Sequence, residues 1–201
     1  MESQYVVEEG RNGMRSEKEG QVMVANKKTV RGSDVVLRFL AFALTLVAAI
    51  VLGVDKQSKV VSVSIVPSLP PINAFLTAKW HYLSAFVYFV AVNSIACAYA
   101  AISLLLVLAN RGHGKKGLIS LIIIILDLIM VALLFSAGGA ALAVGLIGYQ
   151  GNSHVQWNKV CNAFDKFCQQ VAAAIVVSLF GSAVYLLLVL LAALNLHKKH
   201  N

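Results

Sequence analysis

Four long apolar runs, two of which contain a single charged residue, limit what this 201-residue chain can fold into. The runs cover about residues 35–54, 83–109, 118–147 and 171–196. Each reaches the roughly 20 residues that an α-helix needs to cross a hydrocarbon core about 30 Å thick. Because backbone amides in lipid must bond within their own segment, each run predicts a helix. The chain is therefore expected to be an all-α membrane protein with four transmembrane helices in an antiparallel bundle.

Composition leaves no room for a second globular domain, since 59% of the residues are hydrophobic and the runs take up about half of the chain. We expect a disordered cytosolic tail over residues 1–33, a membrane domain over 34–196 and a short cytosolic tail over 197–201. The first residues show no apolar stretch of signal-peptide length, so the first helix is expected to serve as the insertion signal.

The distribution of basic residues predicts the orientation of the chain in the membrane. Four spans place both termini and the connector around residues 110–117 on one side, with eleven Lys and Arg residues against five on the other. Counting only those near span ends, the ratio is nine to five. The positive-inside rule then places both termini in the cytosol. This signal accounts for most of the net charge of +8, and nucleic acid is not expected as a partner.

The two charges inside the runs are Arg38 and Asp127. A charge at the bilayer centre costs a few kcal/mol, and Asp127 lies about nine residues, or roughly 14 Å, into its run. The preferred interpretation is a structural ion pair between two helices, because the long third run can protrude and bring Asp127 to the depth of Arg38. Two alternatives stay open. Arg38 extends to the headgroups beside a neutral Asp127, or Asp127 belongs to a proton- or ion-handling site.

Two cysteines, Cys161 and Cys168, fall in the second outer loop, where an oxidising compartment favours a disulfide. A continuous helix would hold them about 10 Å apart, beyond the roughly 7 Å limit for a bridge, so we expect a bend between them. A zinc pair is less favoured, since His154 is the only nearby partner. Cys97 is interpreted as a small apolar core residue.

The first outer loop contains all three prolines of the chain and an alternating Val61, Val63 and Ile65. The alternation predicts a short extracellular strand, and the prolines predict an extended or turning segment. The aromatic run from Trp80 to Tyr82 is expected to mark the outer membrane interface.

Small residues at four-residue spacing predict close helix packing in the third and fourth runs. The third run has Gly139 with Ala143 and Ala141 with Gly145, and the fourth has Gly181. The spacing leaves open whether these faces pack inside the bundle or between copies of the chain.

Catalytic motifs are absent from the sequence, and all five histidines lie outside the runs. We expect no enzyme, no cofactor and no metal site. An intramembrane enzyme would need a second polar residue facing Asp127, and Arg38 is the only candidate expected there.

Several segments together resemble the Casparian strip membrane domain protein-like (CASP-like) family of plants, in particular its first subgroup, which is related to the MARVEL four-span proteins. They are residues 77–90 (TAKWHYLSAFVYFV), residues 93–99 (NSIACAY), the loop from Trp157 to Cys168, and the charges Arg38 and Asp127. The resemblance covers about residues 30–196. The family's Casparian strip members carry an outer-loop signature with an acidic residue and paired phenylalanines. Residues 67–75 lack both, so the resemblance implies the wider family.

The resemblance implies a multi-pass protein of the plasma membrane that forms homodimers and heterodimers with family members. The expected function is a non-enzymatic scaffold that self-associates, organises a membrane domain and recruits extracellular cell-wall enzymes. The alternative is a small channel or transporter, or an accessory subunit of one, in which Asp127 titrates.

Overall fold

The computed structural model describes residues 32–63, 72–109, 117–151 and 159–200. The predicted tail up to residue 31, the prolines, the basic connector and Trp157 lie outside these residues. The chain divides into two units, Met1–Leu37 and Arg38–Asn201. The described residues of the first unit belong to a helix that continues into the second unit.

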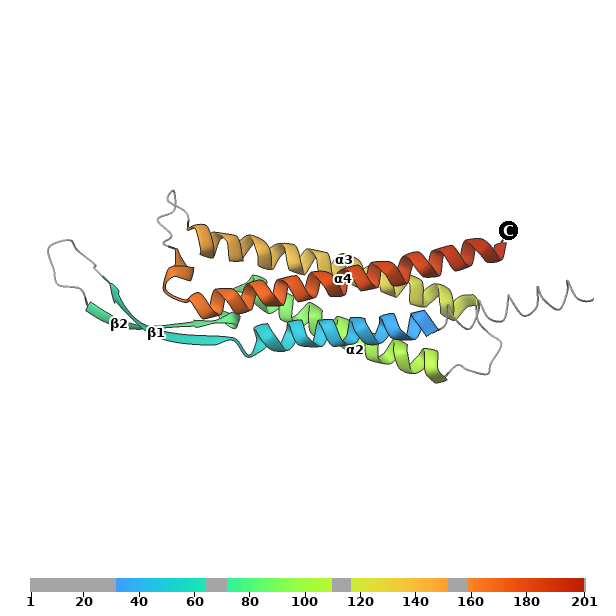
Figure 1. Cartoon of the computed structure of the whole chain (residues 1–201), viewed down its shortest axis with the longest axis horizontal. Helices are drawn as coiled ribbons and strands as arrows, with labels where there is room; N and C mark the ends of the chain where they lie inside the picture. The colour runs from blue at the N-terminus through green and yellow to red at the C-terminus, as the bar shows by residue number, and fades with distance from the viewer. Residues whose placement is uncertain (1–31, 64–71, 110–116, 152–158, 201) are drawn as a thin grey trace, which may run out of the picture. The chain divides into compact units, whose positions relative to one another are not determined.

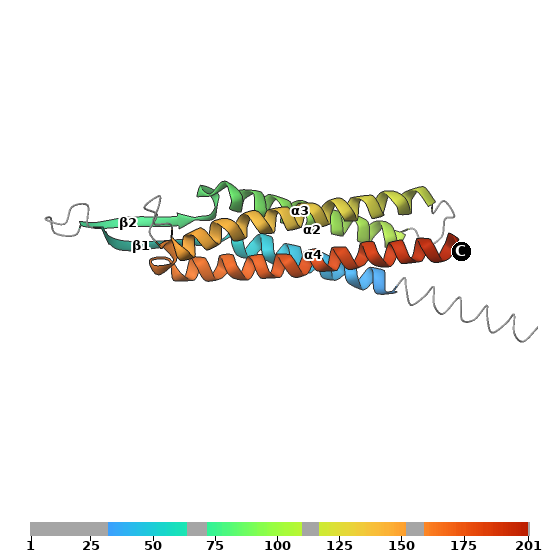
Figure 2. The ribbon, with the colours of Figure 1, turned by 90° about the horizontal axis from the view of Figure 1, so that it is seen from above.

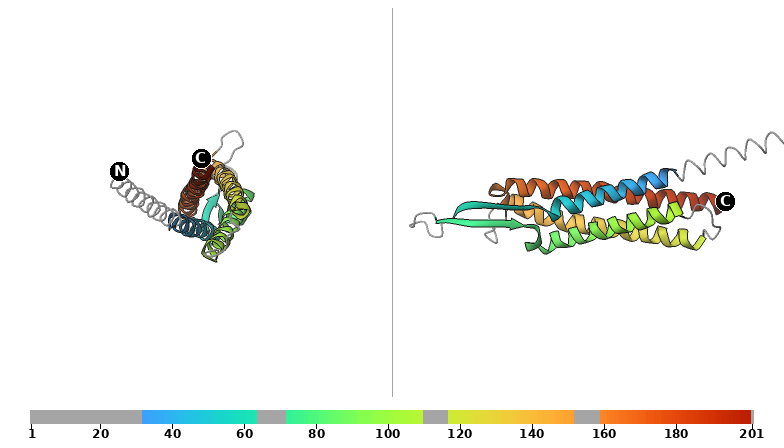
Figure 3. Two further views of the ribbon diagram at one scale, coloured as in Figure 1. Left: turned by 90° about the vertical axis from the view of Figure 1, so that its right-hand side faces the viewer. Right: turned by 90° about the horizontal axis from the view of Figure 1, so that it is seen from below.

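Four helices long and apolar enough to cross a membrane are present among the described residues, which confirms the predicted fold class. They are the first helix Gly32–Gly53, α2 Ser84–Ala109, α3 Gly117–Gln150 and α4 Asp165–His200. Within the second unit, successive helices run in opposite directions and lie side by side (Figures 1 and 2). The end-on view in Figure 3 shows them as a bundle.

The two C-terminal helices are longer than a bilayer requires. With 34 and 36 residues, α3 and α4 are about 51 and 54 Å long, against about 30 Å of hydrocarbon core. Helix α4 begins six residues before its apolar run and continues into the segment that was expected to be a tail. The ends of both helices therefore extend beyond the hydrocarbon.

Burial along the first helix follows a narrow stripe. Its buried positions are spaced three and four residues apart: Arg38, Ala41, Thr45, Ala48 and Leu52. Large apolar residues between them are exposed and suit a lipid surface. The first helix thus contributes one face to the core, and the first buried residue on that face is the charged Arg38.

A two-stranded antiparallel sheet lies at the end of the bundle where the first helix ends (Figure 1). Strand β1, Lys56–Val63, agrees with the predicted extracellular strand up to Val63, and Ile65 lies outside the described residues. Strand β2, Ile72–Lys79, was not predicted, and the pair extends from Lys56 opposite Lys79 to Val63 opposite Ile72. The predicted all-α class therefore did not include this small sheet. A 3-10 turn, η1 Trp80–Tyr82, joins β2 to α2.

Some of the small residues of the third and fourth spans face the interior of the bundle, and others face away from it. A Cβ atom on Gly181 would lie 3.4 Å from the Thr45 methyl group, and one on Gly145 would lie 3.9 Å from Val171. Both glycines therefore pack within the bundle. Gly139 and Ala143 are exposed on the outward face of α3, and a Cβ on Gly139 would meet no described atom within 4 Å.

This division predicts opposite effects of the same substitution. Gly181→Leu should lower the free energy of unfolding by about 1–3 kcal/mol, because the side chain has to displace the first helix. Gly139→Leu should leave it unchanged. Thermal unfolding in detergent micelles, followed by labelling of the buried free thiol of Cys97, measures both. Equal losses would contradict the assignment of the two faces.

Candidate functional site: a buried polar network between the helices

An ion pair joins the first helix to α3. Arg38 Nη2 lies 3.0 Å from Asp127 Oδ2, and Arg38 Nη1 donates to Asp127 Oδ1 at 3.3 Å. Arg38 is 4% exposed and Asp127 is fully buried. A two-pronged contact of this kind fixes the orientation of both side chains as well as neutralising their charges.

Two side chains of α2 also contact the ion pair. Arg38 Nη1 also donates to Ser103 Oγ at 3.0 Å, and that hydroxyl donates to the carbonyl oxygen of Ala100. The Tyr99 hydroxyl donates to Asp127 Oδ1 at 2.7 Å, with the Ile123 carbonyl oxygen as its other acceptor at 3.1 Å. The network therefore connects three helices.

Helix α4 adds a second layer of polar contacts. Tyr185 stacks on Tyr99 with ring centroids 6.3 Å apart, and its hydroxyl donates to the Ala96 carbonyl oxygen at 2.6 Å. Further along, the Ser178 hydroxyl donates to the side-chain oxygen of Asn93 at 2.9 Å. The side chains of Tyr185, Ser178 and Asn93 are buried, whereas Tyr99 is half-buried. Together the two layers bring polar groups from every span into one core.

The structure brings Arg38 and Asp127 together as the sequence analysis preferred, but it also shows what that analysis missed. The expectation that only Arg38 faces Asp127 was wrong, because Tyr99 also donates to Asp127, and Ser103 contacts Arg38 next to it. These two residues are four positions apart on α2 and so share a face, which is the signal that was available. Neither carries a charge, so neither required a partner in the way that Arg38 did.

The arrangement is suited to holding helices together. The carboxylate of Asp127 is occupied by a guanidinium and a phenol, and a guanidinium does not give up its proton in proteins. In lipid, an unpaired member of this set would cost several kcal/mol. Each partner thus keeps the others in place.

A disulfide closes the segment at the beginning of α4. Cys161 lies in a 3-10 turn, η3 Val160–Asn162, and Cys168 lies in the first turn of α4, with their Cα atoms 5.7 Å apart. The chain bends between the two elements, as the distance limit for a bridge requires. Within the described residues, no group of three His, Cys, Asp or Glu side chains is placed to hold a metal ion.

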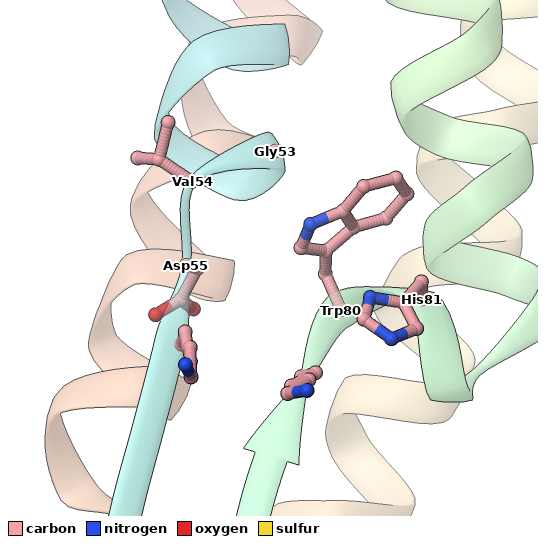
Figure 4. Close-up of a pocket in the computed structure, with 7 residues that line it drawn as sticks. Gly53, Val54, Asp55, Trp80 and His81 are labelled. Carbon is pink, nitrogen blue, oxygen red and sulfur yellow. The ribbon is translucent and has the colours of Figure 1, made fainter.

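A second buried acid, which the sequence analysis did not single out, lies where the first helix ends. Asp55 is 2% exposed, and neither carboxylate oxygen accepts a hydrogen bond in the described part of the chain. Burial raises the pKa of this carboxyl from its ordinary 3.8 to about 6. Asp55 lines a pocket of about 230 Å³ that Trp80 and His81 border from the opposite side (Figure 4).

Comparisons with known proteins give a consistent result. Residues 27–184 match the Casparian strip membrane protein domain. The chain is 60% identical to CASP-like protein 1E2 of Glycine max over 183 residues, which covers 91% of this chain and 97% of the relative. It is 58% identical to CASP-like protein 1E2 of Vitis vinifera, covering 94% and 95%, and 50% identical to CASP-like protein 1E1 of Arabidopsis thaliana, covering 89% and 95%. No solved structure matches the chain.

Removing one member of the ion pair should be far more harmful than removing both. Arg38→Met or Asp127→Leu alone leaves a buried charge without its partner, so each should lower the free energy of unfolding by about 3–5 kcal/mol. The double variant should recover most of this loss, since Tyr99 and Ser103 each retain a backbone acceptor. A double-mutant cycle based on thermal unfolding in micelles measures the coupling, and strictly additive losses would contradict it.

Asp55 should make stability fall as the pH rises from about 4 to 6. In this window the folded protein still holds a proton that the unfolded chain has released, so the folded state loses free energy with each increment of pH. The full loss is about 3 kcal/mol for a shift of about two units. Unfolding temperatures of the wild type and Asp55→Asn across this range test the effect. The variant should lack this component, and identical pH profiles would contradict it.

Proposed function

Since the chain belongs to the Casparian strip membrane protein domain family of plants, we propose that it is a non-enzymatic scaffold of the plasma membrane that self-associates within the bilayer. The observation that carries this proposal is the outward position of Gly139 and Ala143 on α3. Small residues on an exposed helix face allow the backbone of a second helix to approach closely, which drives association in lipid.

The outward face has the features that a helix contact between two copies needs. Gly139 and Ala143 lie four residues apart and therefore on one side of the helix. Exposed apolar side chains flank them, among them Phe135, Leu142 and Leu146. A second copy can pack its own Gly139 region against this face, while the larger flanking residues interdigitate around it. The partner in this contact is a second copy of the chain or another family member.

The buried network supports a scaffold over a channel or transporter. A proton or ion pathway through Asp127 requires this carboxylate to change its charge or its partner during transport. Asp127 is instead fully buried between Arg38 and Tyr99. An ion pair held in this way favours one rigid arrangement of the helices. Such rigidity suits a scaffold, which offers its surfaces to other proteins. It also favours a structural over a catalytic role for Asp127.

The excess of basic residues near the termini supports an orientation with both ends of the chain in the cytosol. The sheet β1–β2 and the disulfide segment then face the cell exterior. Both are available there to extracellular partners, and cell-wall-modifying enzymes are the class proposed. The lysines at the bundle end of the sheet, Lys56 and Lys79, give this surface a basic character.

The test of self-association is the lateral mobility of the fluorescently tagged protein in a plant plasma membrane. The wild type should recover slowly after photobleaching, and Gly139→Leu should recover several-fold faster because the side chain separates the two helices. The matched control is Ala183→Leu, which places the same leucine side chain at an exposed small position on α4. This control should move as slowly as the wild type.

A direct measurement complements mobility. Under mild oxidation, Ala143→Cys should form a disulfide-linked dimer in membranes, whereas Ala183→Cys should not. Fast recovery of the wild type, or equal cross-linking at both positions, would overturn the proposal.

A further inference from the structure

The side chain of Gln57 in β1 reaches across to the beginning of α4. Its carbonyl oxygen accepts a hydrogen bond from the backbone N–H of Phe167 at 2.9 Å, and its NH2 group donates to Asp165 Oδ1 at 3.4 Å. Phe167 is the third residue of α4, and the first four N–H groups of a helix have no acceptor within that helix. Gln57 is therefore an N-terminal cap that another element supplies to α4.

The disulfide closes the stretch of chain that contains both partners of this cap. Cys161 and Cys168 are seven residues apart, and Asp165 and Phe167 lie between them. A bond across a short loop removes most of the open conformations that the loop would otherwise reach. The position of the N–H group and the carboxylate that Gln57 binds therefore depends on this bond.

The disulfide is accessible, whereas the free thiol of the chain is not. Cys161 and Cys168 are both half-buried, so a small reductant can approach their sulfur atoms. Cys97, the third cysteine of the sequence, is buried within α2. Because thiol–disulfide exchange requires a thiolate that can reach the bond, the reductant has to come from outside the chain.

We propose that the disulfide between Cys161 and Cys168 is a redox-sensitive latch that docks the β1–β2 sheet on α4. A dithiol reductant forms a mixed disulfide with one cysteine and then closes to its own cyclic disulfide, so that two electrons and two protons pass to the two cysteines. The first turn of α4 then opens more often, and the cap from Gln57 is lost with it. Neither self-association nor the orientation of the chain in the membrane enters this proposal.

The experiment measures amide hydrogen exchange of the full-length protein in nanodiscs by mass spectrometry, with and without dithiothreitol. Peptides from the first turn of α4, from the beginning of β1 and from the middle of α2 are followed separately. Reduction should make exchange in the first turn of α4 roughly 10–100-fold faster, as expected for the loss of a disulfide across a short loop. Exchange at the beginning of β1 should become faster with it, while exchange in α2 should stay the same.

Two variants separate the cap from the disulfide. Gln57→Ala should speed exchange in the first turn of α4 and in β1 while the disulfide is intact, and dithiothreitol should then add little in β1. The matched control is Gln170→Ala, which removes the same amide from an exposed position on α4 and should exchange as the wild type does in both redox states. The double variant Cys161→Ser and Cys168→Ser should exchange like the reduced wild type and should not respond to dithiothreitol.

Two results would overturn the proposal. One is unchanged exchange in β1 after reduction, whether or not the first turn of α4 exchanges faster, because the disulfide would then have no effect on the sheet. The other is faster exchange in the middle of α2, because reduction would then unfold the bundle instead of releasing the sheet. Should the double serine variant fail to fold, the oxidised and reduced wild type decide between these results without any substitution.

Discussion

The ion pair between Arg38 and Asp127 is the contact on which the arrangement of the helices depends. Neither charge is stable in hydrocarbon alone, so the first helix and α3 have to meet at the depth where both are neutralised. Ser103 and Tyr99 then set the rotation of α2, because their hydroxyl groups reach the same two side chains. One electrostatic requirement thus selects depth and rotation for three helices.

The fourth helix is held by a different means. Helix α4 has the largest buried share of the four spans, and its contacts combine close backbone approach with hydrogen bonds. Gly181 allows the first helix to come near, while Ser178 and Tyr185 bond to α2. Since lipid is as apolar as leucine, such packing and hydrogen bonds supply what the hydrophobic effect supplies in water. The outward faces of the bundle remain free for lipid or for other helices.

The sequence predicted those features whose physical cost is large and local. A charge in an apolar run requires a partner, which identified Arg38 and Asp127, and paired cysteines in an outer loop indicated the disulfide. Tyr99 and Ser103 escaped because a neutral hydroxyl can bond to its own helix, so its partner depends on helix rotation. Strand β2 escaped because its pairing with β1 is a long-range contact. Asp55 looked like an ordinary loop residue because its burial arises only from the folded arrangement around it.

The junctions between the sheet and the helices have a mechanical consequence. Only two residues separate the first helix from β1, and β2 passes through a single 3-10 turn before α2 begins. Gln57 of β1 also accepts a hydrogen bond from the backbone N–H of Phe167 in α4. The sheet is therefore joined at one end to the first helix, to α2 and to α4. A displacement of β1 and β2 therefore also displaces the ends of the helices to which they are joined.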